Sequence, residues 1–422
     1  MQQPRPSFGF ARKSLCSISI SLAFAFTGAM PVHAQSAKES VGAALAIPLL
    51  PVPELIKNKK FEEALGKLKE ADAVPNKTPY ETYIINHLRA AAAAGAGEMM
   101  LSAQAYEVVL ASGRLPAAEA LPIMEAIAGI FYNAKDYKPA ATWAQRYLKD
   151  GGTNPQTRLL MVRAMYFGGD YENVRGELVA DIKNVEKAEQ KPTLEQLQML
   201  ASIEQKANDW PAYTVTLEKL VAHYPKDDYW KDLIYRVASK PTFSASLHLN
   251  MTRLRYALGQ FAKADDYVDL ADRVNRAGFP IEAKQVVEQG FAKGVLGTGS
   301  DAAAHQKLRA QLAKEAAEDQ KDIKRAEAEA SKAKDGTGLI GVGFNYVVSG
   351  EVDKGAALME QGLKKGGLKR PDEAALRLGM AYAMAGQKQK ALDTLKTIRG
   401  ADGAEDLAKL WSLYAKQATR AG

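Results

Sequence analysis

The sequence has few of the residues that build reactive centres. Its 422 residues include a single cysteine, Cys16, and five histidines, and only 8% of them are aromatic. One cysteine excludes a disulfide framework and a zinc site made of several cysteines. Four histidines lie beyond the N-terminal segment, and none of them is three or four residues from another histidine. We therefore expect neither a bound metal nor a cofactor.

Long apolar runs and a large excess of one charge are also missing. Charged residues make up 25% of the chain and hydrophobic residues 47%, which excludes both a multi-span membrane protein and a disordered chain. The 56 basic residues exceed the 49 acidic ones by only a few and form no long run, so nucleic acid is not expected as a partner. A chain of this length should form two or more domains or an elongated array of small units.

Motifs for catalysis and nucleotide binding are absent or out of context. Gly336, Gly338 and Gly341 have the spacing of a dinucleotide fingerprint, but a charged helix end precedes them where a buried strand is required. We interpret them as a turn that opens the next repeat. Gly294 and Gly299 have phosphate-loop spacing without the lysine that the loop needs. We expect no catalytic residues and no enzyme, and a hydrolase is kept only as a third hypothesis.

The N-terminus has the organisation of a secretory signal. Residues 1–13 carry basic but no acidic side chains, an apolar stretch covers residues 15–30, and small residues precede a cleavage site after Ala34. Cleavage would remove Cys16 and leave a periplasmic chain without a membrane span. Retention of the segment as an anchor is the alternative, although its apolar stretch is short for a spanning helix.

A turn pattern recurs through the rest of the chain. Apolar residues follow helical spacings of three and four, and there is no sustained alternation of the strand kind. The turn itself is a Gly or Asp, then an aromatic or apolar residue, then a small residue. It begins at Asp136, Asp170, Asp209, Gly278, Gly350 and Gly386. The intervals are about 34 to 39 residues, or about twice that, which is typical of a solenoid of about nine or ten helix pairs.

Two C-terminal stretches carry a more specific pattern. The first consists of Gly343, Tyr346, Gly350, Gly355 and Leu363, and the second of Leu378, Gly379, Tyr382, Gly386, Ala391 and Leu395. At these residues the chain resembles the tetratricopeptide repeat (TPR) family, although Gly355 stands where that family prefers alanine. The resemblance implies an all-α fold, an α-solenoid wound as a right-handed superhelix of TPR-like helix–turn–helix repeats. Small residues such as Gly343 and Gly379 would let paired helices approach closely.

Changes in this pattern divide the chain into five parts. We expect a cleavable signal peptide at 1–34, TPR-like repeats at 35–225, degenerate repeats with a possible bend at 226–300, a charged helical pair and TPR repeats at 301–400, and a capping helix at 401–422. Opposite charges three or four residues apart predict the charged pair over residues 301–334. The last helix would cover the core of the final repeat, and docking to a partner is its alternative use.

The candidate binding residues are side chains on the first helix of each repeat that point outward and are not needed for helix packing. The resemblance places those helices on the concave face. The candidates are amides, tyrosines and arginines, which can bond an extended peptide backbone or lie against a sugar ring. They are Tyr132, Asn133, Arg163, Tyr166, Gln198, Gln205, Asn275 and Arg276. The alternative is that they are ordinary solvated residues. The paired Lys/Asn/Arg pattern that binds a C-terminal carboxylate in some family members is not evident.

These observations favour a non-catalytic periplasmic TPR scaffold or adaptor that binds a peptide segment or protein partner in a cell-envelope assembly. Resemblance to periplasmic repeat proteins suggests a link to energy-coupled outer-membrane transport. The alternative is a polysaccharide-binding superhelix in exopolysaccharide export. Exposed aromatics with acids would favour sugar, whereas the mixture of Tyr, Gln and Arg favours peptide.

Overall fold

The recurring turn of the sequence closes one helix and starts the next. At all six positions the residue two places before the start of the next helix has a positive φ, for example 63° at Lys135 and 85° at Gly169. The amide that follows then bonds back five residues, as Asp136 N does to the Phe131 carbonyl at 2.9 Å and Asp170 N to the Met165 carbonyl at 2.9 Å. This is the left-handed helix-ending motif that satisfies the last carbonyls of a helix. One turn chemistry therefore explains the repeat.

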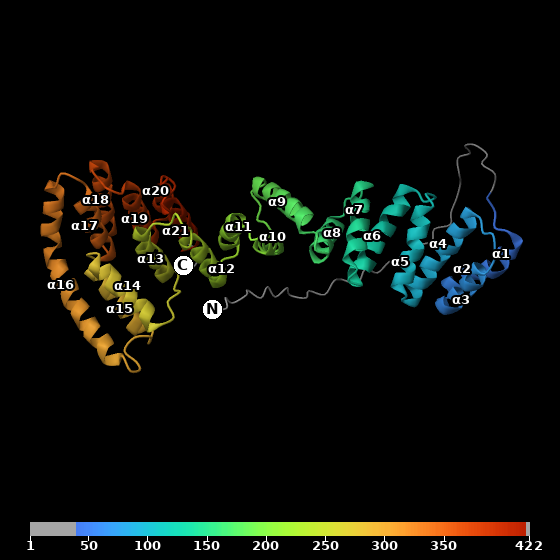
Figure 1. Ribbon diagram of the computed structural model, residues 1–422, viewed down its shortest axis with the longest axis horizontal. Coiled ribbons are helices and arrows are strands. Elements are labelled where there is room, and N and C mark those ends of the chain that lie inside the picture. Colours follow the sequence, from blue (N-terminus) through green and yellow to red (C-terminus); the bar gives the residue numbers. More distant parts are fainter. Residues whose placement is uncertain (1–38, 419–422) are drawn as a thin grey trace. The chain divides into compact units, whose positions relative to one another are not determined.

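The predicted all-α fold, a solenoid of TPR-like helical hairpins, is confirmed. The computed structural model describes residues 39–418, and no β-strand occurs in that range (Figure 1). None of the helices in this range combines the length and apolar character that a membrane crossing needs. The predicted signal peptide and Cys16 lie outside the described residues.

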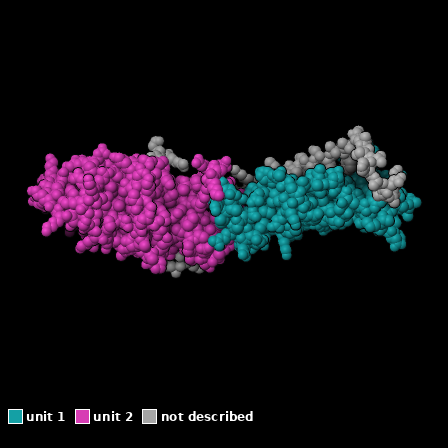
Figure 2. Space-filling view, turned by 90° about the horizontal axis from the view of Figure 1, so that it is seen from above, with its two compact units in different colours: residues 1–184 teal, residues 185–422 magenta. Residues whose placement is uncertain are grey.

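Contacts between helices divide the chain into two units, which Figure 2 colours separately. The division falls between residues 184 and 185, whereas the sequence placed its internal divisions after residues 225, 300 and 400. The helices of unit 1 (residues 39–184) are α1 Ala43–Leu49, α2 Val52–Lys57, α3 Phe61–Asp72, α4 Pro79–Ala96, α5 Met99–Ala111, α6 Ala117–Asn133, α7 Tyr137–Lys149, α8 Pro155–Phe167 and α9 Tyr171–Lys187, which crosses the division.

Unit 1 is built from neighbours in the sequence. From α3 to α8, each helix packs against the next one along the chain. Its N-terminal end is held at the start of α4, where Thr78 and Glu81 form a capping box. The Glu81 carboxylate also accepts a hydrogen bond of 2.8 Å from the Gly42 amide, which precedes α1. One buried side chain therefore caps α4 and fixes the entry of α1.

The helices of unit 2 (residues 185–422) are α10 Leu194–Lys206, α11 Trp210–His223, α12 Asp227–Ala238, a 3₁₀ turn Ala245–Leu247, α13 His248–Ala257, α14 Ala264–Arg276, α15 Pro280–Ala292, α16 Ala302–Lys332, α17 Thr337–Val348, α18 Val352–Lys365, α19 Pro371–Met384, α20 Lys388–Leu395 and α21 Ala404–Ala418. The possible bend of the sequence falls on α12, the 3₁₀ turn and α13, after which the hairpins resume.

The expectation of a charged pair of helices over residues 301–334 is wrong in one respect, because the structure has a single helix there. Residues 302–332 form one helix, α16, of 31 residues. They include neither glycine nor proline, so nothing interrupts the helix. Its buried residues fall seven or four positions apart and make one continuous stripe. They are His305, Leu312, Ala316, Ile323 and Ala330. The predicted charge pairing is present, since Arg325 Nη2 lies 2.7 Å from Asp322 Oδ2.

The last helix returns to the beginning of unit 2. Helix α21 packs against α19 and α20, as a cap would, and also against α11 and α12. Gln417 accepts a hydrogen bond of 3.2 Å from Trp230 Nε1 and donates one of 2.8 Å to the Val221 carbonyl. Lys240 pairs with Asp406 at 2.9 Å. The array of unit 2 is thus closed by its own C-terminal helix, and Trp411 is fully buried there.

Helices α17 and α18 pack through glycines. A Cβ added at Gly336 would lie 1.8 Å from the Gly362 carbonyl oxygen, which is far inside van der Waals contact. The first glycine of the dinucleotide-like spacing is therefore required by helix packing, and it opens a repeat as expected.

Candidate binding surface

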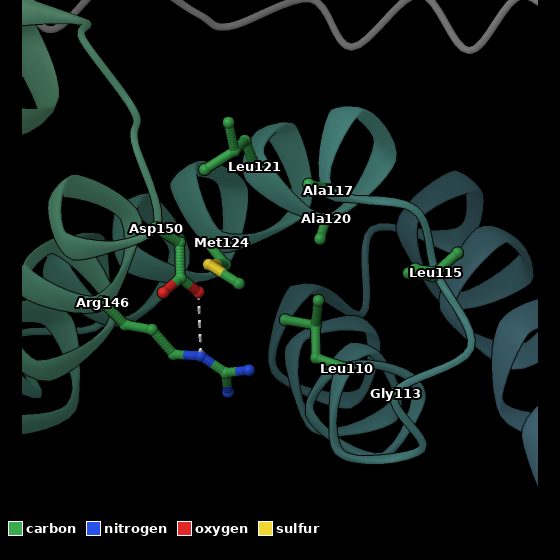
Figure 3. Close-up of a pocket in the computed structure, with 9 residues that line it drawn as sticks. All are labelled: Leu110, Gly113, Leu115, Ala117, Ala120, Leu121, Met124, Arg146 and Asp150. Carbon is green, nitrogen blue, oxygen red and sulfur yellow. Dashed lines mark ion pairs between the residues drawn. The ribbon is translucent and has the colours of Figure 1, made fainter.

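A pocket opens in unit 1 between the end of α5, the loop of residues 112–116, the start of α6 and the end of α7 (Figure 3). Its volume is about 230 Å³. Drug-sized ligands and cofactors occupy sites of roughly 300–1,000 Å³, so this pocket suits one large side chain better than a cofactor. The apolar residues that line it are Leu110, Leu115, Ala117, Ala120, Leu121 and Met124.

The pocket lies where α5 is connected to α6 by residues 112–116, a longer connection than the turns that join α4 to α5 and α6 to α7. Helix α5 ends at Ala111, and Gly113 has a φ of 66°, which turns the chain away from the helix axis. Pro116 then serves as the N-cap of α6. The loop between them keeps the start of α6 away from the end of α5, and Leu115 lines the resulting space.

One ion pair stands at the side of this apolar space. Arg146 Nε lies 3.5 Å from Asp150 Oδ2, and the two side chains are 44% and 41% exposed. The Arg146 guanidinium also lies 5.1 Å from the ring centroid of Trp143, whose Nε1 donates a 2.8 Å hydrogen bond to Glu107. The stacked indole restricts the arginine and holds its charge beside the pocket. The site therefore combines apolar burial with one oriented cation.

Four of the predicted contact residues lie in unit 1. Asn133 is exposed at the end of α6, whereas Tyr132 and Arg163 are half-buried. Tyr166 was expected to point outward, but it is buried, with 8% of its surface exposed. Its ring packs at 5.4 Å from Phe167 and 5.7 Å from Tyr171, which fill the space between α8 and the start of α9.

The structure brings two of these residues into one series of rings. Consecutive centroids lie 5.7 Å apart from Tyr132 to Tyr137 and 5.3 Å apart from Tyr137 to Phe167, and the series continues to Tyr166 and Tyr171. The rings come from the ends of α6 and α8 and the starts of α7 and α9. Each of these two hairpins contains one copy of the repeated turn, and the contact between Tyr137 and Phe167 connects the two copies. Phe167 is 45% exposed, so the series has an apolar surface.

The four predicted residues of unit 2 are not gathered at one place. Gln198 Nε2 donates to the Tyr229 hydroxyl at 2.8 Å, and Asn275 Nδ2 donates to Glu315 at 2.7 Å. Both amides thus connect packed helices. Arg276 pairs with Asp272 one turn earlier on α14, and Gln205 is half-buried on α10. Their role in binding stays a prediction.

Unit 2 also contains a buried ion pair that the sequence did not indicate. Arg253 donates to Glu282 through Nε at 2.8 Å and through Nη2 at 2.6 Å, and the two side chains are 1% and 7% exposed. The guanidinium packs against the rings of both Phe279 and Phe344, at 5.1 and 4.9 Å from their centroids, which lie 5.2 Å from each other. Burial and the charge of Arg253 lower the pKa of the neighbouring Arg377. This cluster joins α13, α15, α17 and α19, and its chemistry is structural.

Sequence reasoning missed the pocket because three separated segments build it. No spacing within one segment reveals that Arg146 faces the loop that begins after Ala111. The only local signal is Leu115, an apolar residue placed between a glycine and a proline in a loop. Within residues 39–418, no group of three or more His, Asp or Glu side chains could hold a metal ion.

Comparisons with known proteins add little. No protein-family model matches the chain, and no curated protein matches it. The chain is similar to a solved structure of Naa15/Naa10 bound to HypK-THB, with 14% identity and a TM-score of 0.30, covering 83% of this chain and 62% of that one. The chain thus spans less than two thirds of that structure's chain.

Two further similar structures are of TPR domains. The TPR2AB-domain complex of yeast Sti1 has 13% identity and a TM-score of 0.23 and covers 71% of this chain and 99% of that one. The P58(IPK) TPR domain has 12% identity and a TM-score of 0.22 and covers 90% and 99%. Such low scores carry no argument. The assignment of a TPR-like fold rests on the helical hairpins and their common turn.

Proposed function

We propose that the protein is a non-catalytic periplasmic adaptor that binds a peptide segment or protein partner in a cell-envelope assembly. The pocket on unit 1 carries this proposal. Its apolar lining gains free energy when a side chain leaves water, about 1.5–3 kcal/mol for one Leu, Phe or Met. The Arg146 charge beside it adds orientation. Both effects favour binding of a polypeptide.

Export is part of the proposal and is supported by the sequence of residues 1–34 alone. The link to energy-coupled outer-membrane transport is also part of the proposal and rests on resemblance. N-terminal sequencing of the protein recovered from the periplasm tests cleavage. A start at Gln35 is expected, whereas an intact N-terminus in the membrane fraction would contradict it.

Capture from an envelope extract tests the binding function. The full processed chain, carrying a C-terminal tag, is cross-linked in an envelope extract, purified and analysed for bound protein. A defined protein partner is expected, and its yield should fall strongly with Ala117→Trp, which fills the pocket from an exposed position. Ala118→Trp is the matched control, because Ala118 is exposed but does not line the pocket. Recovery of glycan without any enriched protein would contradict the proposal.

A second candidate is a polysaccharide-binding surface, and one observation favours it. The ring series includes the 45% exposed Phe167, and Asn133 and Asp136 are exposed next to Tyr132 and Tyr137 of the same series. Rings with neighbouring acids and amides suit sugar. Affinity electrophoresis in gels that contain exopolysaccharide tests it: retardation lost with Phe167→Ala but kept with Val179→Ala, a control that is 47% exposed on α9, would favour this candidate.

A further inference from the structure

We infer that the pocket on unit 1 takes an extended acidic-apolar peptide segment, with a large apolar side chain in the pocket and a carboxylate side chain two residues away on Arg146. This inference rests on the proposed function and names the chemistry of the partner at that site. The occupant is thus a segment of another protein.

The pocket separates its two chemistries in space. Figure 3 shows Leu115, Ala117 and Ala120 on one side, with Arg146 and Asp150 on the other. An occupant therefore needs an apolar group at one end and an anionic group at the other. Within an internal segment of a chain, no single residue carries both an apolar side chain and a carboxylate, so two residues of the partner are required.

Arg146 has unused capacity to bind an anion. The shortest contact of its ion pair with Asp150 is made by Nε, at 3.5 Å, which is longer than a normal hydrogen bond. Among the residues that the structure describes, no side chain accepts a hydrogen bond from Arg146 Nη1 or Nη2. Figure 3 shows these two nitrogens turned toward Leu110 and away from Asp150. A guanidinium presents such a pair of donors to one carboxylate. The charge of the site is therefore complementary to an acidic side chain.

An extended segment can place two side chains on the same face of the pocket. Successive side chains of an extended peptide point to opposite faces, so residues i and i+2 share a face at about 6.6 Å along the chain. An apolar residue in the pocket thus places the side chain two residues away over the neighbouring α7, where Arg146 lies. An adjacent acidic residue would point away from the protein.

Titration with a short blocked peptide tests the inference. The probe is acetyl-Ala-Leu-Ala-Glu-Ala-amide, added to the full processed protein labelled at its methionine methyl groups. The Met124 methyl signal, assigned with Met124→Leu, reports occupancy because Met124 lines the pocket. Weak saturable binding is expected. Replacing Glu by Gln in the probe should weaken it roughly two- to fivefold, as for an exposed ion pair, and replacing Leu by Ala should abolish it.

Variants of the protein separate the charge from the fold. Arg146→Gln should remove the difference between the Glu and Gln probes. Asp150→Asn should strengthen binding of the Glu probe roughly two- to fivefold and leave the Gln probe unchanged, because it removes a competing carboxylate. Arg273→Gln is the matched control, since Arg273 pairs with Asp269 one turn away at 3.0 Å but lies in unit 2.

Two results would overturn the inference. Equal binding of the Glu and Gln probes would remove the role of Arg146. Binding that requires a free C-terminal carboxylate, as in acetyl-Ala-Ala-Leu, and not the internal Glu would replace the internal segment by a chain end. In either case a protein partner captured from the envelope would leave the adaptor function standing, so the two failures are distinguishable.

Discussion

Gly343 of α17 and Gly355 of α18 face each other without room for a methyl group on either side. A Cβ at Gly343 would lie 2.6 Å from the Gly355 carbonyl oxygen, and a Cβ at Gly355 would lie 2.4 Å from the Gly343 carbonyl oxygen. Backbone atoms cannot move aside as a flexible side chain can. This contact explains why glycine stands at 355, where TPR repeats prefer alanine: the two helices of this hairpin approach more closely than an alanine allows.

Gly355→Ala is expected to destabilise unit 2. Alanine normally stabilises a helix interior by about 0.5–1 kcal/mol, but overpacking costs typically 1–3 kcal/mol, so the net change should be a loss. Urea denaturation of the full chain, followed by tryptophan fluorescence, measures it, because Trp210, Trp230 and Trp411 all lie in unit 2. Gly341→Ala on α17 is the control, since a Cβ there meets nothing within 4 Å. A Gly355→Ala variant as stable as Gly341→Ala would refute the close contact.

Removal of one partner of the buried ion pair should cost far more than removal of both. Glu282→Gln leaves Arg253 charged and buried without its carboxylate, and we expect a loss of about 3–5 kcal/mol in unfolding free energy. Replacing both residues, with Arg253→Met and Glu282→Leu, should restore much of that loss because no unpaired charge remains. The same denaturation experiment compares the variants. Equal destabilisation by the single and double changes would show that the pair acts through packing alone.

The closing contacts of α21 give a third prediction. Gln417→Ala removes its hydrogen bonds to Trp230 and to the Val221 carbonyl, and should lower the stability of unit 2 by about 1–2 kcal/mol. Loss of the bond to the indole should also change the fluorescence maximum. Lys416→Ala, at an exposed neighbouring position, is the control and should be nearly neutral. Identical behaviour of the two variants would argue that α21 does not bind α11 and α12 through Gln417.

Acid should loosen the N-terminal helices. The backbone amides of Thr78 and Gly42 lower the pKa of the Glu81 carboxyl below its ordinary value of 4.5. A lowered pKa means that this carboxylate stabilises the fold at pH values above 4.5, and that the contribution disappears as the pH falls through the lower folded value. Hydrogen exchange of the amides of α1 and α2 should therefore show a loss of protection below pH 4.5. In Glu81→Gln the protection should be lower at neutral pH and change less with acid, and an unchanged profile would contradict the assignment.

The hairpins could be predicted from sequence because each one is determined locally. The turn at Asp136 needs a left-handed residue, a returning amide and two apolar stripes, and all of these lie within one repeat. The repeat period favours two helices over residues 301–334, whereas the absence of glycine and proline between residues 302 and 332 allows the single helix α16. Alignment of the repeats by their turn residues predicts that Tyr166 points outward. Its burial depends on its contacts with Phe167 and Tyr171, which the alignment does not show.

Features that join distant segments could not be predicted. Arg253 and Glu282 lie 29 residues apart, in different hairpins, and nothing in either segment shows that their side chains meet. The pocket has the same origin, since Leu115 and Arg146 come from a loop and from the end of α7. Periodicity identifies which side chains are buried in a helix, but the identity of their partners depends on how the hairpins stack.

The position of α21 also determines which unit can complete its folding first. The hydrogen bonds that close unit 2 connect residues 187 and 196 positions apart, so they cannot form before residue 417 has been synthesised. Unit 1, in which α3 to α8 each meet the next helix along, can assemble without any residue of α21. Until α21 has been made, the faces of α11 and α12 that it covers stay exposed. A chain truncated before α21 would therefore have a complete unit 1 and an uncovered surface on unit 2.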